Sequence, residues 1–261
     1  MQHPGGLSIT SGGGMAITTD AEQAFRYLKA SCSGRTPDDV LWAFAQGMEE
    51  LADWVRELAE AVGASIDESS RRVGATYSFP GHQYLGAIKI KRGTEDGQLF
   101  PWAQGLRGGA RLFWVVERNV QMRKIDVMLN TAARKLIRDE CGRVIGVVAE
   151  QQGRSIRIRA GKGVILACGG FEHNEEMKRQ YFEAQPVYGV TAIGNTGDGI
   201  RMSQEVGAEL WHMWHFHGGY GFKFDDYPVA FRHTISGPRV ENKIMPWIMV
   251  DRFGKRFVNE Y

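Results

Sequence analysis

The stretch Gly194-Asn195-Thr196-Gly197-Asp198-Gly199-Ile200 places two turns of small residues around one aspartate, and a helical pattern begins directly after it. Glycines let a backbone approach a ligand closely, and the start of a helix leaves N–H groups free for an anion. A carboxylate beside them can accept hydrogen bonds from hydroxyl groups. The pattern indicates a site for a sugar-phosphate or polyol-phosphate ligand such as a nucleotide or a flavin. The alternative is a loop–helix junction in which Asp198 caps the helix.

Two further stretches end in glycine turns. Gly5–Gly14 is rich in glycine and serine, and Gly163–Phe171 is an apolar run that leads into a double glycine. In this order, the three segments resemble the FAD-binding domain of the fumarate reductase/succinate dehydrogenase flavoprotein family, which includes the 3-ketosteroid dehydrogenases. The resemblance extends over nearly the whole chain, through Ile125–Asn130, Lys135–Ile137, Gly142–Val147 and Gly254–Glu260.

Composition excludes several other classes of protein. The 261 residues carry a net charge of +2 without a basic block or acidic tail, so nothing indicates a nucleic-acid partner. The three cysteines form no CxxC pair, which argues against a disulfide framework or a zinc site and favours a reducing compartment, the cytoplasm. No apolar run approaches the roughly 20 residues of a membrane span.

The helices of the first half are predicted from start signals and periodicity. Asp20 is expected to cap a helix that runs to about Ala30, and Thr36-Pro37-Asp38-Asp39 opens a longer helix to about Val62, with a break near Gly47. The apolar stripe of the longer helix, including Phe44 and Trp54, is predicted to face the core. Residues 1–19 are too rich in Gly, Ser and Thr for a core element and are expected to form a ligand-binding loop.

The second half is predicted to contain strands. Ile125–Leu129 is expected to be a strand, and Lys135–Arg138, Val144–Glu150 and Ser155–Arg159 are expected to pair around turns. Val164–Ala167 is continuously apolar, as in a parallel strand buried on both faces. Glu175–Phe182 reads as a short helix.

The resemblance implies an α/β fold. A flavoprotein of this kind normally opens with a strand, a GxGxxG turn and a helix, which are not in this sequence. We therefore expect a fragment: a Rossmann-like FAD-binding domain lacking its N-terminal βαβ unit (residues 1–217), and the start of an α+β capping domain (residues 218–261).

The resemblance also implies which residues hold the cofactor. Ser8 and the run Ser11, Gly12, Gly13, Gly14 match the loop along the pyrophosphate and flavin. Ala133 matches the position that clamps the adenine. The turn Ala167, Cys168, Gly169, Gly170 matches the family's Ala-Thr-Gly-Gly, with Cys168 in place of Thr. Asp198 matches a carboxylate that contacts FAD. Leu7 stands where some relatives carry a flavin-linked histidine, so FAD is expected to be held non-covalently.

For the substrate, a small molecule, the resemblance points to His217 as the catalytic-site histidine, which in the family binds a substrate carboxylate. Gly218 and Gly219 replace the Pro and Thr that usually follow it. The three histidines His212, His215 and His217 also allow a metal site, but no acidic or cysteine partners accompany them, so no metal is expected. The family's proton-donating arginine would lie four residues after Asn259-Glu260, beyond Tyr261.

The sequence thus predicts a fragment of an FAD-dependent oxidoreductase that transfers hydride between flavin N5 and a carbon next to a carbonyl. A 3-ketosteroid dehydrogenase-like enzyme is one alternative, favoured by the aromatic residues around Trp211–Phe216. A non-catalytic remnant, or a subunit completed by another chain, is another. The electron donor or acceptor does not follow from the resemblance.

Overall fold

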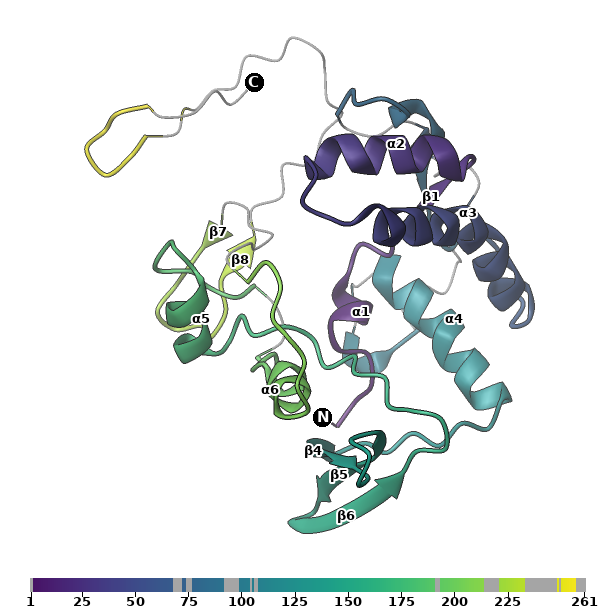
Figure 1. The fold of residues 1–261 in the computed structure, drawn as a ribbon, viewed down its shortest axis with the longest axis vertical. Helices are drawn as coiled ribbons and strands as arrows, with labels where there is room; N and C mark the ends of the chain where they lie inside the picture. The colour runs from purple at the N-terminus through teal and green to yellow at the C-terminus, as the bar shows by residue number, and fades with distance from the viewer. Residues whose placement is uncertain are drawn as a thin grey trace.

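The structure is a computed structural model. It describes residues 2–67, 72–73, 77–91, 99–103, 105, 108–190, 193–213, 221–232, 248 and 250–256. Helices and antiparallel strands share this part of the chain (Figure 1), which confirms the mixed α/β class. The sheets within it are three small ones, with strand orders β1-β3-β2, β4-β5-β6 and β7-β8.

The first sheet is covered by helices. Its strands are β1 (Met15–Thr18), β2 (Arg72–Val73) and β3 (Leu85–Ile88), and Met15 pairs with Ile88 in antiparallel register. The helices are α3 (Asp38–Glu60) and α4 (Gly108–Met122). Apolar side chains from all of these except β2 form the main core, whose buried members are Ile17, Val55, Ala59, Ile66, Ile88, Ile90 and Val115.

The start of α2 (Ala21–Cys32) lies where the sequence predicted it. The Asp20 side chain accepts a hydrogen bond from the N–H of Gln23 at 3.0 Å, which satisfies one of the donors at the helix start. Small residues let α2 pack closely on α3, because Ala24 and Ala45 are fully buried between them (Figure 1).

Helix α3 differs from its prediction in two ways. It continues through Gly47 without a break, since packing on the sheet and α2 outweighs the roughly 1 kcal/mol that glycine costs in a helix. The predicted burial of its aromatic residues is wrong. Phe44 and Trp54 are 58% and 57% exposed, whereas the smaller Ala45 and Val55 beside them are buried.

The N-terminal segment is not only a loop. Residues 6–10 form helix α1 (Gly6–Thr10), residues 15–18 form β1, and Ile9, Ile17 and Thr18 are buried. The prediction that residues 1–19 contain no core element is therefore wrong. Glycine and serine at this point serve close packing, because α1 lies against α4.

The second sheet is the predicted meander. It consists of β4 (Thr131–Arg138), β5 (Val144–Gln151) and β6 (Arg154–Arg159), paired in sequence order. Leu136 pairs with Val147, which pairs with Ile158, so one face of the sheet carries an apolar row. Figure 1 shows the meander at the opposite end of the molecule from α2.

Two predicted strands are not paired in the described part of the chain. Residues 125–129 and 163–170 form neither helix nor strand, and neither segment takes part in a described sheet. Ile165 is 95% exposed. The prediction of a parallel strand buried on both faces is thus wrong for Val164–Ala167 as the structure stands, because no neighbouring strand covers it.

The chain then forms α5 (Glu175–Tyr181), close to its predicted range, and α6 (Asp198–Glu205). Beyond them, β7 (Gly221–Phe222) pairs with β8 (Phe231–Arg232), and the N–H of Ala230 donates to the Gly189 carbonyl at 2.9 Å. Val250 and Arg256 form an isolated antiparallel bridge. Two short 3-10 helices, η2 (His82–Tyr84) and η4 (Pro101–Ala103), complete the elements.

Candidate cofactor site

Two glycine turns that are distant in the sequence lie against each other. The N–H of Gly197 donates to the Gly170 carbonyl at 3.0 Å, and the N–H of His173 donates to the Asn195 carbonyl at 3.1 Å. The Asn174 side-chain amide donates to the Thr196 carbonyl at 2.9 Å. The double-glycine turn and the turn that opens α6 therefore form one unit.

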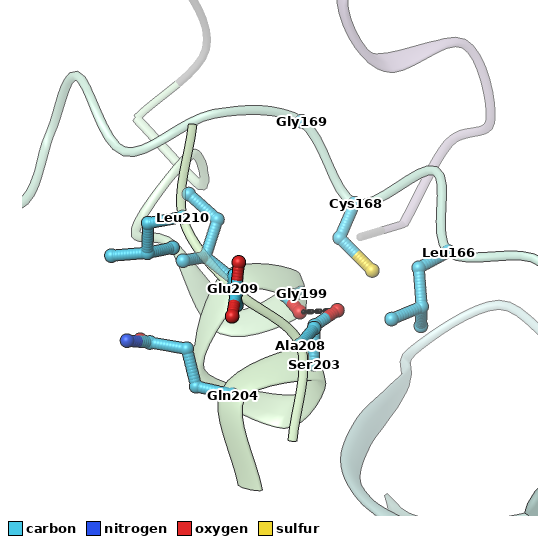
Figure 2. A pocket seen from close by; sticks show the side chains of 10 residues that line it. Leu166, Cys168, Gly169, Gly199, Ser203, Gln204, Ala208, Glu209 and Leu210 are labelled. Carbon is cyan, nitrogen blue, oxygen red and sulfur yellow. Dashed lines mark hydrogen bonds between the residues drawn. The ribbon is translucent and has the colours of Figure 1, made fainter. Parts of the chain in front are cut away.

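A pocket of about 340 Å³ lies where these turns meet. Its lining residues come from the double-glycine turn, from α6 and from the segment after α6: Leu166, Cys168, Gly169, Gly199, Ile200, Ser203, Gln204, Ala208, Glu209 and Leu210. Figure 2 shows the Cys168 side chain directed toward the first turn of α6, where Ser203 Oγ donates to the Gly199 carbonyl at 2.8 Å. The volume is at the lower end for a ligand site and can take only part of a dinucleotide.

Asp198 is the first residue of α6. The residue before it, Gly197, takes the N-cap position with φ +82°, and its backbone caps the helix without a side-chain hydrogen bond. Asp198 is exposed, and one of its oxygens accepts a hydrogen bond from Thr196 Oγ1 at 3.2 Å. The cap alternative for Asp198 is therefore wrong. The geometry combines an exposed carboxylate with the N–H groups of a first helical turn, which lack partners within the helix.

The glycines of this site have a packing role as well. A Cβ on Gly169 would lie 2.5 Å from Asn195 Oδ1, and one on Gly199 would lie 3.0 Å from the Cβ of Cys168. Both turns need glycine to approach each other, whether or not a ligand is bound. The features of this site that suit a cofactor are the pocket and the free N–H groups at the start of α6.

Ala133 lies in β4, at a register shift between Ala133 and Lys135, and β4 is packed against α6. The strand that carries Ala133 therefore contacts the helix that begins at Asp198.

The predicted N-terminal residues are placed differently. Of the predicted cofactor residues, Cys168 and Gly169 line this pocket, whereas Ser8, Ser11, Gly12, Gly13, Gly14, Ala133, Ala167, Gly170 and Asp198 do not. The N–H of Gly109 donates to the Ser11 carbonyl at 2.9 Å, and Ser11 Oγ donates to the Ser8 carbonyl at 2.9 Å. This loop is fixed on the start of α4.

His217 and His215 lie outside the described residues, so the predicted substrate site stays a prediction. His212 is described and its ring packs edge-on against Trp211 at 4.4 Å. In the described ranges, no three His, Cys, Asp or Glu residues are grouped as they would be for a metal ion. The helices of those ranges include none that is both long and apolar enough to cross a membrane.

Sequence reasoning missed two residues of this region, Glu172 and Asn195. The Asn195 side chain is 7% exposed and its amide donates to Glu172 Oε1 at 2.7 Å. Each residue lies next to a glycine turn, and this position in the sequence was a signal of a role at the site. Their contact spans 23 residues of sequence and could not be read from either motif alone.

Comparison with known proteins identifies the family. Residues 2–261 match the model of the FAD binding domain. The chain is 26% identical over 242 residues to the 3-oxosteroid 1-dehydrogenase of Comamonas testosteroni, covering 68% of this chain and 42% of that protein. It is also 26% identical over 265 residues to the urocanate reductase of Eggerthella lenta, covering 98% of this chain and 40% of that protein.

A solved structure shows the same fold. The 3-ketosteroid delta1-dehydrogenase from Sterolibacterium denitrificans superposes with a TM-score of 0.76 at 20% identity, covering 88% of this chain and 53% of that one. This chain belongs to the FAD binding domain family. The predicted family and its cofactor, FAD, are confirmed. The chain spans less than half the length of the two relatives named above.

Proposed function

We propose that the protein containing these residues is an FAD-dependent oxidoreductase, and that residues 1–217 form most of its FAD-binding domain. Bound FAD would supply N5 as the donor or acceptor of hydride, exchanged with a substrate carbon next to a carbonyl. The observation that carries the proposal is the contact between the double-glycine turn and the start of α6, over one pocket.

Within this site each residue has a defined role. Asp198, exposed in the first turn of α6 next to the pocket-lining Gly199, would accept hydrogen bonds from cofactor hydroxyl groups. The N–H groups of that turn face the cofactor and favour its negative groups. Cys168 and Gly169 form the opposite wall. These contacts would hold the cofactor non-covalently, because the family resemblance aligns Leu7 with the position where some relatives carry a flavin-linked histidine.

The sheet of this domain would be completed by a segment outside residues 1–261. Residues 125–129 and 163–167 are mostly apolar and pair with no strand among the described residues. Ile125, Val127 and Ile165 are each more than half exposed. Two parallel strands of a βαβ unit, inserted beside these segments, would cover them, and the GxGxxG turn of that unit would bind the pyrophosphate.

Residues 218–261 would begin the capping domain, and His217 would lie between the two domains on the substrate side. There it would bind a carbonyl or carboxylate oxygen of a small-molecule substrate. An acid or base of the capping domain would move the proton, because hydride transfer to carbon needs a proton transfer to complete the reduction.

A 3-ketosteroid is the second candidate for the substrate. The 3-oxosteroid 1-dehydrogenase of Mycobacterium tuberculosis (strain ATCC 25618 / H37Rv) is 35% identical over 195 residues, covering 66% of this chain and 31% of that protein. The side chain of Trp211, just before the predicted substrate site, is 68% exposed and could lie against an apolar ring system.

The test is to purify the full-length protein and measure bound flavin by absorbance, then turnover with a 3-ketosteroid and an artificial electron acceptor, and with fumarate and a reduced dye. Flavin bound in a 1:1 ratio with turnover of either substrate class supports the proposal. Flavin-free protein that takes up no added FAD would indicate a non-catalytic remnant.

A further inference from the structure

We propose that Glu172 and Asn195 form a positioning pair that fixes the double-glycine turn against the start of α6, and thereby sets the shape of the cofactor site. This role rests on the proposed function, because it concerns the same site. Neither residue lines the pocket, so the pair acts through the turns that do.

The contact joins the half-buried carboxylate of Glu172 to the buried amide of Asn195. Asn195 Nδ2 donates to Glu172 Oε1 at 2.7 Å, and Asn195 is 7% exposed. A hydrogen bond to an ionised acceptor is about twice as strong as one between neutral groups. Asn195 is the buried member of the pair, and an amide that lost its acceptor there would be destabilising.

Both residues of the pair also lie against the two glycines of the double-glycine turn. Gly169 has φ +79°, and a Cβ there would lie 2.5 Å from Asn195 Oδ1. A Cβ on Gly170 would lie 2.5 Å from Glu172 Oε2. The pair therefore occupies the space directly beside the double glycine, and its displacement would release the turn that presents Cys168 to the pocket.

Substitutions that break the hydrogen bond and then restore it distinguish the bond from packing alone. A simple loss of packing would not be reversed by the second substitution. Asn195→Asp puts two carboxylates where one hydrogen bond stood, so they repel each other while both are ionised. Glu172→Gln keeps an oxygen that accepts from Asn195. In the double variant Glu172→Gln/Asn195→Asp, the glutamine amide can donate to the new carboxylate, which restores the bond with its direction reversed.

Asn119→Asp is a matched control for stability. Asn119 is 5% exposed in α4, and its Nδ2 donates to the Leu58 carbonyl at 2.8 Å. Its burial matches that of Asn195 and its amide also donates, but the acceptors are backbone carbonyls and the residue belongs to the α3–α4 core. A loss of flavin that merely follows loss of stability would occur in Asn119→Asp as well.

The experiment measures FAD dissociation constants, the visible flavin spectrum and thermal unfolding of the full-length protein for these variants, at neutral pH and near pH 5. We expect Asn195→Asp to bind FAD roughly tenfold or more weakly, corresponding to the loss of one hydrogen bond to a charged group. The change should diminish at the lower pH, where one carboxyl becomes protonated. Glu172→Gln and the double variant should bind within about threefold of wild type.

The proposal is overturned if the double variant binds no better than Asn195→Asp, or if Asn119→Asp loses flavin to the same extent at equal stability. It is also overturned if Asn195→Asp keeps wild-type affinity and spectrum, in which case the proposed function stands without the pair. Wild-type protein that binds no FAD would instead refute the proposed function itself.

Discussion

Gly13 faces the carbonyl group of Gly108 so closely that a Cβ on Gly13 would overlap it. Gly13 also has φ +65°, a conformation that side-chain-bearing residues adopt with strain. Gly108 and Gly109 in turn lie against the backbone of Gly12 and Ser11. The glycine-rich loop that resembles a cofactor-binding segment is thus also the place where the segment after α1 packs closely on the start of α4.

This relationship separates the packing role of the loop from its binding role. Gly13→Ala should lower the free energy of unfolding by roughly 2–5 kcal/mol, the combined effect of a left-handed conformation and overpacking. Gly12→Ala is the matched control, because a Cβ there would have no neighbour within 4 Å. Its stability should stay within about 0.5 kcal/mol of wild type.

Chemical denaturation of the full-length protein measures the free energy of unfolding of both variants, and FAD titration measures their affinity for the cofactor. If Gly12 faces the cofactor, as the family resemblance implies, Gly12→Ala should bind FAD more weakly at unchanged stability. Equal destabilisation by the two substitutions would contradict a specific packing role of Gly13 against Gly108.

The elements that the sequence predicted correctly depend on local signals. Asp20 caps α2 through a residue three positions away, and the meander β4–β5–β6 is built from neighbouring strands joined by turns. Alternation and turn residues are sufficient for such elements.

The elements that were missed depend on distant partners. The contact of Gly13 with Gly108 and the bond of Asn195 to Glu172 join segments that the sequence gives no reason to pair. The run Val164–Ala167 was predicted to be a buried strand from its apolar residues alone. Burial of a strand is a property of its neighbours, and the described residues supply none.

Lys178 is a buried lysine in α5, the helix that follows the double-glycine turn, and its contacts can be tested by substitution. It is 2% exposed in α5, and its Nζ lies 2.6 Å from Glu175 Oε1 and donates to the Val187 carbonyl at 2.7 Å. Lys178→Met keeps most of the length of the side chain but leaves that carbonyl without its donor. We expect a loss of about 1–3 kcal/mol in chemical denaturation. Arg179→Met, at the exposed neighbouring position, should change stability by no more than about 0.5 kcal/mol.

Asp198 and His217 should separate cofactor retention from turnover. Asp198→Ala would remove the proposed acceptor for cofactor hydroxyl groups, and such a loss typically costs about 1–3 kcal/mol, or a tenfold to hundredfold loss of FAD affinity. His217→Ala should retain flavin with an unchanged spectrum and alter only the substrate kinetics. Flavin occupancy and turnover of the full-length variants, measured side by side, check both. Release of flavin by His217→Ala, with retention by Asp198→Ala, would reverse the two assignments.

Residues 1–261 produced alone should bind FAD weakly or not at all. The proposed βαβ unit would anchor the pyrophosphate and complete the sheet, and an incomplete site loses the preorganisation that supports affinity. Gel filtration with excess FAD, followed by absorbance of the protein peak, measures this. A stoichiometric yellow complex of these residues would show that no further segment is needed for cofactor binding.

Ile165 provides the sharpest test of whether a strand of the proposed βαβ unit lies beside residues 163–167. In residues 1–261 it is 95% exposed, so Ile165→Lys should leave the thermal unfolding midpoint of this piece unchanged. In the full-length protein, a strand beside residues 163–167 would bury this position, and an unpaired lysine there would be strongly destabilising. Val40→Lys is the control, since Val40 is 52% exposed on α3. It should have little effect in either form. A substitution at Ile165 that is equally harmless in both forms would show that this face stays open, and that the unpaired segment is not the edge of a larger sheet.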